Sequence, residues 1–285
     1  IRGPQGTTVV LTILHKGAQK PIDVTIARGT IPIISVKTQE LEKGYVMARI
    51  TRFNEHTTKE LHDKLAEYAK KQPIKGIVLD LRNNPGGLLE QAVTVADTFL
   101  ADGLVVYIQG KDPQSRRDFM ARKHNDELSQ TPIVCLINAG SASAAEIVAG
   151  ALQDRKRSLL IGEKTFGKGS VQTVVSLPDG SGIKLTTALY YTPNGRSIQA
   201  EGIVPDLDIP FAAPPSDEDK NNKDRFTFRE KDFQRHLENA NGKKGKKKGA
   251  ATADSDAARV IIEKDNQVRL GLEMVKQLPK IKEIR

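Results

Sequence analysis

The 285-residue chain has no tryptophan, a single cysteine and few aromatic residues. These shortages limit the kinds of fold and covalent cross-link that the chain can form. With Cys135 alone, a disulfide within the chain is excluded; it lies in an apolar run, where a buried and unreactive thiol is expected. No apolar run approaches the roughly 20 residues that a membrane-spanning helix needs. The aromatic share of 5% fits an α/β core built from small aliphatic side chains.

The net charge is +9, and a cluster of five lysines within residues 243–248 contributes much of the excess. No aromatic residue is interleaved with these lysines, as it would be on a surface that stacks bases, so no nucleic-acid partner is expected. The glycine-rich stretch 162–169 lacks the lysine and hydroxyl spacing of a phosphate-binding loop. We therefore expect neither a cofactor nor a metal ion.

Strand and helix patterns alternate between residues 45 and 191, which predicts a layered α/β core. The predicted strands are 45–53, 76–81, 104–108, 132–137 and 158–161, followed by a hairpin of 170–177 and 183–191. The predicted helices are 57–71, which begins with a capping box at Thr57–Glu60, then 88–100 and 144–155. Residues 1–36 predict a β-hairpin, and the polar segment 111–130 suggests a mobile flap.

After Pro210 the composition changes, and residues 211–255 predict a flexible linker rich in small and polar residues. An amphipathic helix is predicted from residue 256, ending at Pro279. The apolar residues on one face of this helix are Ile261, Val268, Leu272 and Val275. Such a helix packs on its own domain or pairs with another chain, so residues 256–285 are a candidate dimerisation element.

Small residues cluster where the strand 132–137 is followed by the helix 144–155, and two hydroxyls, Ser141 and Ser143, lie among them. Ser143 and Glu146 have capping-box spacing, so Ser143 could simply cap the helix. The alternative is chemical. A hydroxyl at a helix N-terminus lies near unpaired backbone N–H groups and the positive end of the helix dipole, which suits acyl transfer. The residues of this stretch do not decide between the two serines.

Lys168 is a candidate general base, because Gly167 and Gly169 beside it allow close approach of the backbone. To act as a base its amine must be neutral, which requires desolvation to lower its pKa. If a strand begins at Lys168, alternation places Lys168, Ser170 and Gln172 on one face, and Gln172 could orient the amine. An ordinary exposed lysine in a glycine turn is the alternative. None of the five histidines adjoins a serine or glycine motif.

The turn after the strand 76–81 contains Gly86 and Gly87. We expect one of them to present a backbone N–H to an oxyanion, with the N–H of Ala144 as the second donor. The alternative is an ordinary turn. Asp80 and Arg82 are expected to pair and to hold this turn.

Taken together, four motifs in this order resemble the carboxy-terminal processing (tail-specific) serine proteases. They are Leu79–Leu88, Gly140–Glu146, Gly162–Gln172 and Gly202–Asp206. The resemblance covers about residues 1–210. It implies that Ser143 rather than Ser141 is the catalytic serine, that Lys168 is the general base and that Gln172 supports the lysine.

The resemblance also implies a fold: a crotonase/ClpP-like layered protease core over residues 31–210, preceded at 1–30 by the C-terminal strands of a PDZ domain. The implied activity is endopeptidase cleavage at or near apolar C-terminal tails through an acyl-enzyme. The implied partners are tail-bearing proteins, an adaptor and further copies of the chain, in the periplasm or another exported location, with membrane association. Two alternatives remain: a catalytically silent scaffold, and a crotonase-type acyl-CoA enzyme. The intact set of Ser143, Lys168 and Gln172 argues against the scaffold.

Overall fold

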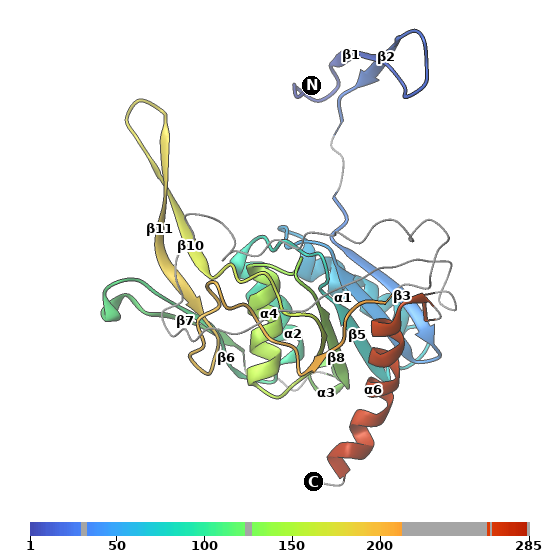
Figure 1. Ribbon diagram of the computed structural model, residues 1–285, viewed down its shortest axis with the longest axis vertical. Coiled ribbons are helices and arrows are strands. Elements are labelled where there is room, and N and C mark those ends of the chain that lie inside the picture. Colours follow the sequence, from blue (N-terminus) through green and yellow to red (C-terminus); the bar gives the residue numbers. More distant parts are fainter. Residues whose placement is uncertain (30–32, 123–126, 213–260, 263, 284–285) are drawn as a thin grey trace. The chain divides into compact units, whose positions relative to one another are not determined.

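The structure is a computed structural model that describes residues 1–29, 33–122, 127–212, 261–262 and 264–283 (Figure 1). The chain divides into two units, 1–34 and 35–285, which are described separately. In the first unit, β1 (Thr8–Ile13) and β2 (Ile22–Ala27) form an antiparallel hairpin, as predicted. Its assignment to a PDZ domain stays a prediction.

The second unit is built on a six-stranded sheet with strand order β12-β9-β8-β5-β4-β3. The strands are β3 (Val36–Glu42), β4 (Tyr45–Ile50), β5 (Gly76–Asp80), β8 (Ile133–Ile137), β9 (Leu159–Gly162) and β12 (Leu207–Asp208). Only the β3–β4 pair is antiparallel. Every residue of β5 and β8 is buried, because both faces of the sheet are covered. Cys135 in β8 is fully buried, and burial raises the pKa of its thiol.

Helices cover the two faces of this sheet unequally. On one face, residues of α1 (Thr57–Ala69), α2 (Leu89–Phe99) and α4 (Ala144–Asp154) share a large apolar core with the sheet. On the other, α6 (Asn266–Glu283) buries Val268, Leu272 and Val275 in a second core (Figure 1). The predicted amphipathic helix therefore packs on its own domain; its role in dimerisation stays a prediction. The predicted helix start at residue 256 lies outside the described residues.

A second, antiparallel sheet has the order β10-β11-β6-β7. Its strands are β10 (Ser170–Ser176), β11 (Gly182–Tyr191), β6 (Gly103–Gln109) and β7 (Arg117–Ala121). The hairpin of β10 and β11 projects from the rest of the unit (Figure 1). The prediction of a flap at 111–130 is wrong for most of the segment, which contains a 3₁₀ turn (Pro113–Ser115), β7 and α3 (Glu127–Gln130). β7 is held because it pairs with β6 and packs Phe119 against the core.

Two further local predictions need correction, and one strand was not predicted. Glu60 does not close a capping box on Thr57: its carboxylate accepts from the backbone N–H groups of Ser35 and Val36, and His56 is the N-cap of α1. The strand β3 was not predicted, because its polar sequence hides the alternation. α6 continues through Pro279 to Glu283 rather than ending there. Of the predicted linker 211–255, only residues 211 and 212 are described.

Candidate active site

Ser143 is the N-cap residue of α4, at the end of the connection from β8. Its backbone has φ +55° and ψ −114°, a conformation that costs a non-glycine residue on the order of 1–3 kcal/mol. Its N–H donates to Oε2 of Glu146 at 2.8 Å, so the predicted tie between Glu146 and the helix start is present. The side chain is partly buried. Strain of this kind persists only where the surrounding structure fixes the backbone.

The neighbouring hydroxyl of Ser141 has a different environment. Ser141 is fully buried; its Oγ donates to the carbonyl of Leu81 at 2.8 Å and accepts from the N–H of Asn138 at 3.1 Å. These bonds join the end of β5 to the loop before α4. Ser141 therefore has a structural role, and the choice of Ser143 as the catalytic serine stays a prediction.

Glu146 connects three segments of the site. It is fully buried, and its Oε1 accepts from Thr165 Oγ1 at 2.5 Å and from Gly167 N at 2.7 Å. Its Oε2 accepts from Ser143 N at 2.8 Å and from Lys168 N at 2.9 Å. Burial raises the pKa of Glu146 to about 7, although these hydrogen bonds act in the opposite direction. The sequence indicated only the bond within the helix start.

Sharing one carboxylate oxygen brings the Ser143 and Lys168 backbones together. Both nitrogens lie within 2.9 Å of the same atom, so they cannot be more than twice that distance apart. A second bond, from Phe166 N to Ser141 O at 3.0 Å, also joins the two loops. Within the described residues, no hydrogen bond links Ser143 Oγ to Lys168 Nζ.

Gln172 lies on β10, which begins two residues after Lys168. β10 begins at Ser170 rather than at Lys168, and its register with β11 shifts between Val171 and Gln172. The shift skips Thr187, so the extra residue of this bulge lies in β11, and Gln172 is exposed. Lys168 therefore lies outside the strand, and the role of Gln172 stays a prediction.

Gly86 lies directly against the loop that leads from β8 into α4 (residues 138–143). A Cβ at this position would lie 2.9 Å from Ser143 Cβ and 2.7 Å from Ala142 O, and the glycine has φ +96°. Any side chain would therefore separate the two loops. The N–H of Gly86 donates to Asn84 Oδ1 at 2.9 Å.

Two other backbone N–H groups remain available. In the part of the chain that the structure describes, the N–H groups of Gly87 and Ala144 donate to no protein acceptor. Gly87 is exposed, and Ala144 is the first residue of α4, where the N–H has no partner within the helix. Of the two glycines, Gly87 is thus the one with a free donor.

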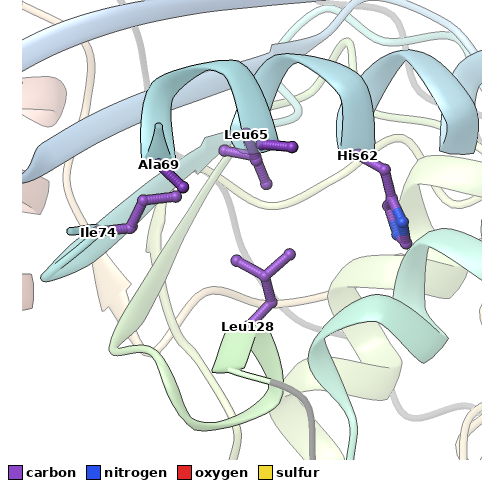
Figure 2. A pocket seen from close by; sticks show the side chains of 6 residues that line it. His62, Leu65, Ala69, Ile74 and Leu128 are labelled. Atoms are coloured by element: carbon purple, nitrogen blue, oxygen red, sulfur yellow. The ribbon is translucent and has the colours of Figure 1, made fainter. Parts of the chain in front are cut away.

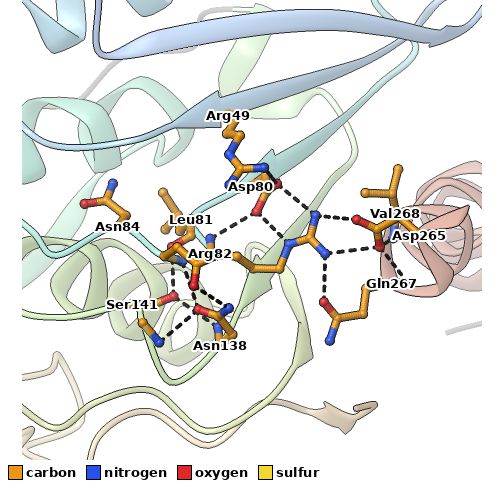
Figure 3. Close-up of polar contacts among 12 residues, drawn as sticks. Arg49, Asp80, Leu81, Arg82, Asn84, Asn138, Ser141, Asp265, Gln267 and Val268 are labelled. Atoms are coloured by element: carbon orange, nitrogen blue, oxygen red, sulfur yellow. Dashed lines mark hydrogen bonds and ion pairs between the residues drawn. The ribbon is translucent and has the colours of Figure 1, made fainter. Parts of the chain in front are cut away.

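Asn84, which the sequence did not single out, holds the glycine turn. Its Nδ2 donates to Ile50 O at 2.8 Å, and its carbonyl accepts from Ala142 N at 2.9 Å. Beside it, Asn83 and Asn138 exchange two hydrogen bonds of 2.9 and 3.0 Å (Figure 3). Hydrogen bonds therefore hold the turn both to β4 and to the loop that precedes α4.

The predicted pair of Asp80 and Arg82 is confirmed. Arg82 Nε and Nη2 donate to the two Asp80 oxygens, each at 2.9 Å (Figure 3). Burial alone would raise the pKa of Asp80, but the charge and hydrogen bonds of Arg82 outweigh it and lower the pKa.

An apolar hollow of about 270 Å³ lies between α1 and α3 and is lined by none of the predicted site residues (Figure 2). His62, its one titratable lining residue, is hydrogen-bonded to Thr98 Oγ1 at 2.8 Å. Among the described residues, no group of three His, Cys, Asp or Glu side chains could hold a metal ion. No described helix is long and apolar enough to cross a membrane.

Comparison with known proteins places these features in a family. The model for peptidase family S41 matches residues 44–209. The carboxy-terminal-processing protease of Bartonella bacilliformis is 43% identical over 257 residues, covering 89% of this chain and 57% of that protein. The carboxy-terminal processing protease CtpA of Bacillus subtilis is 41% identical over 207 residues, covering 73% and 44%. The chain thus spans about half the length of these relatives.

Among solved structures, the photosystem II D1 C-terminal processing protease is 36% identical with a TM-score of 0.57, covering 73% of this chain and 56% of that one. A putative S41 protease from Bacteroides fragilis, at 20% identity and a TM-score of 0.51, shares the fold. The family match spans both loops that Glu146 joins, from the glycine turn to the end of the sheet. This chain belongs to peptidase family S41.

Proposed function

We propose that this chain supplies the catalytic core of a serine endopeptidase in which Ser143 is the nucleophile and Lys168 the general base. The main support is the shared carboxylate: Glu146 binds the backbones of Ser143 and Lys168 through one oxygen. The strained backbone of Ser143 and the two unused N–H groups near it add to this support. The names of the relatives supply the reaction class.

In the proposed reaction, the neutral amine of Lys168 accepts the proton of Ser143 Oγ as the oxygen attacks the peptide carbonyl. The C–N bond then breaks, Lys168 returns the proton to the leaving amine, and an acyl-enzyme ester remains on Ser143. A water molecule, deprotonated by Lys168, attacks the ester and releases the second product with Ser143 restored.

The tetrahedral oxyanion would accept hydrogen bonds from the N–H of Ala144 and from the glycine turn. Gly87 is the better candidate there, because the N–H of Gly86 already donates to Asn84. One such donor stabilises a transition state by about 3 kcal/mol. The proposal that Gln172 orients the lysine amine rests on the sequence resemblance alone.

The substrates we propose are proteins that are cleaved near their C-termini, as the names of the relatives suggest. That these C-terminal tails are extended and apolar is proposed on the sequence resemblance. On the sequence resemblance we also propose an adaptor, self-association of the chain, and a PDZ contribution from residues 1–30. The same resemblance suggests a periplasmic or otherwise exported location with membrane association.

The direct test compares four proteins on a folded reporter that ends in an apolar tail. The wild type should cleave it. Ser143→Ala and Lys168→Ala should each lose at least three orders of magnitude in kcat, whereas Ser141→Ala should retain measurable turnover. A serine-directed phosphonate should label the wild type on Ser143. Wild-type cleavage by Ser143→Ala, with loss in Ser141→Ala, would overturn the assignment of the nucleophile.

A further inference from the structure

The guanidinium of Arg82 is shared between the catalytic core and the C-terminal helix. Besides its bonds to Asp80, its Nη1 donates to Asp265 Oδ1 at 3.1 Å and to Gln267 Oε1 at 2.8 Å. Its Nη2 lies 2.8 Å from Asp265 Oδ2. All five N–H groups of a guanidinium can thus be assigned a partner. Arg82 is 7% exposed, so these bonds form away from solvent (Figure 3).

On the helix side, the same residues fix the start of α6. Asp265 Oδ1 accepts from the N–H groups of Gln267 and Val268, at 3.0 and 2.9 Å, as an N-cap does. Gln267 is fully buried, and its Nε2 donates to Ile209 O at 2.7 Å. Asp265 therefore caps α6 and binds the arginine at the same time.

On the core side, Arg82 is followed directly by the glycine turn. Asn83, the next residue, has φ +57° and is paired with Asn138 of the loop that precedes α4. Asn84 follows and binds Gly86. The guanidinium thus sits four residues before the turn glycine that contacts Ser143. A shift of Arg82 would be transmitted through this short, hydrogen-bonded backbone.

We propose that Asp265 and Gln267 are positioning residues: by holding Arg82, the start of α6 sets the geometry of the turn that presents the oxyanion donor. The C-terminal helix is then part of the catalytic apparatus rather than only a cover for the sheet. The catalytic part of this inference rests on the proposed function; the structural coupling of α6 to the turn does not.

The variant that separates these roles is Asp265→Asn. Asparagine caps a helix about as well as aspartate, so α6 should stay docked. The substitution removes only the negative charge that Asp265 places against the guanidinium of Arg82. We expect kcat on the tail-bearing reporter to fall at least tenfold with KM nearly unchanged, because a misplaced donor weakens only the transition state. Gln267→Leu should act in the same direction.

Leu272→Ala is the matched control. Leu272 is 1% exposed in the core between α6 and the sheet, and it has no part in the Arg82 network. This variant should lower Tm by more than Asp265→Asn does, yet leave kcat unchanged well below its melting temperature. If kcat falls equally in both variants, the effect is general loss of stability and the proposal is overturned.

Amide hydrogen exchange gives a readout that does not need activity. We expect the hydrogen-bonded amides of Asn83, Asn84, Gly86 and Leu88 to exchange faster in Asp265→Asn than in the wild type, with no such change in Leu272→Ala. If the wild type fails to cleave any reporter, the proposed function is wrong. Amide hydrogen exchange then tests by itself whether α6 is coupled to the glycine turn. Unchanged exchange at these amides in Asp265→Asn would overturn the proposed coupling between α6 and the turn.

Discussion

Ser143 and Lys168 donate their backbone N–H groups to the same atom, Oε2 of Glu146, at 2.8 and 2.9 Å. The two loops that contain them are far apart in sequence but are held at one buried carboxylate. Thr165 and Gly167 donate to the other oxygen, so each carboxylate oxygen of Glu146 accepts two hydrogen bonds. Its protonation state should therefore matter to the whole site.

The pH dependence of stability should include a contribution from Glu146. Its pKa is about 7 in the folded protein against 4.5 for the ordinary side chain, so between these values the folded state binds the proton and the unfolded state does not. This contribution is fully present below pH 4.5 and is lost as pH rises through 7, by on the order of 3 kcal/mol. Urea unfolding from pH 4 to 8 measures it.

Glu146→Gln should remove that slope, because the amide does not titrate. It should also destabilise the protein at all pH values by about 1–3 kcal/mol, since the NH₂ group faces at least one backbone N–H donor whichever way the amide is turned. The exposed Glu55→Gln is the control and should keep the wild-type profile. An identical pH profile in wild type and Glu146→Gln would contradict the assignment.

Ser143→Gly should stabilise the fold while abolishing cleavage. Glycine adopts φ +55° freely, so the strain at this position is released. We expect about 1 kcal/mol of added stability in denaturant unfolding. Ser143→Ala, which also lacks the hydroxyl, keeps the strain and serves as the control; equal stability of the two variants would argue against stored strain.

Gly86→Ala should reduce activity more than it reduces stability. The new methyl group would lie 2.9 Å from Ser143 Cβ and from Ala144 N, where backbone must move to accept it. We expect kcat to fall by about a hundredfold, as for a displacement of about 1 Å in a catalytic group. Steady-state kinetics beside thermal unfolding measures both effects. Gly180→Ala, in an open turn with φ +83°, controls for backbone strain without contact.

Ser141→Ala should lower stability by about 1–2 kcal/mol, because Leu81 O and Asn138 N lose their buried partner. Chemical denaturation gives the value. Ser181→Ala, in the exposed tip between β10 and β11, removes a hydroxyl bonded only near its own turn and should have little effect. If Ser141→Ala is as stable as Ser181→Ala, the hydroxyl of Ser141 does not join the loops.

Much of the fold followed from the sequence because the signals were local. The apolar runs that became β5 and β8 and the periodic helices predicted the sheet and its covering layers. Prediction failed where another segment supplied the partner. Glu60 had a capping-box position, yet Ser35 and Val36 bind it. The sequence of segment 111–130 suggested an irregular structure, because its residues alone do not indicate that part of it pairs with β6.

The same division holds at the site. The sequence by itself determined the family, the two catalytic candidates and the glycine turn, because each depends on residue type and spacing. Only the tertiary structure decided that Glu146 joins Ser143 to Lys168, that β10 begins at Ser170 rather than at Lys168, and that Asp265 completes the bonds of Arg82. The contacts of Glu146 with Lys168 and of Arg82 with Asp265 join residues that are 22 and 183 positions apart in the sequence. Buried polar groups take whichever partner the fold brings within reach, and residue spacing alone does not specify that partner.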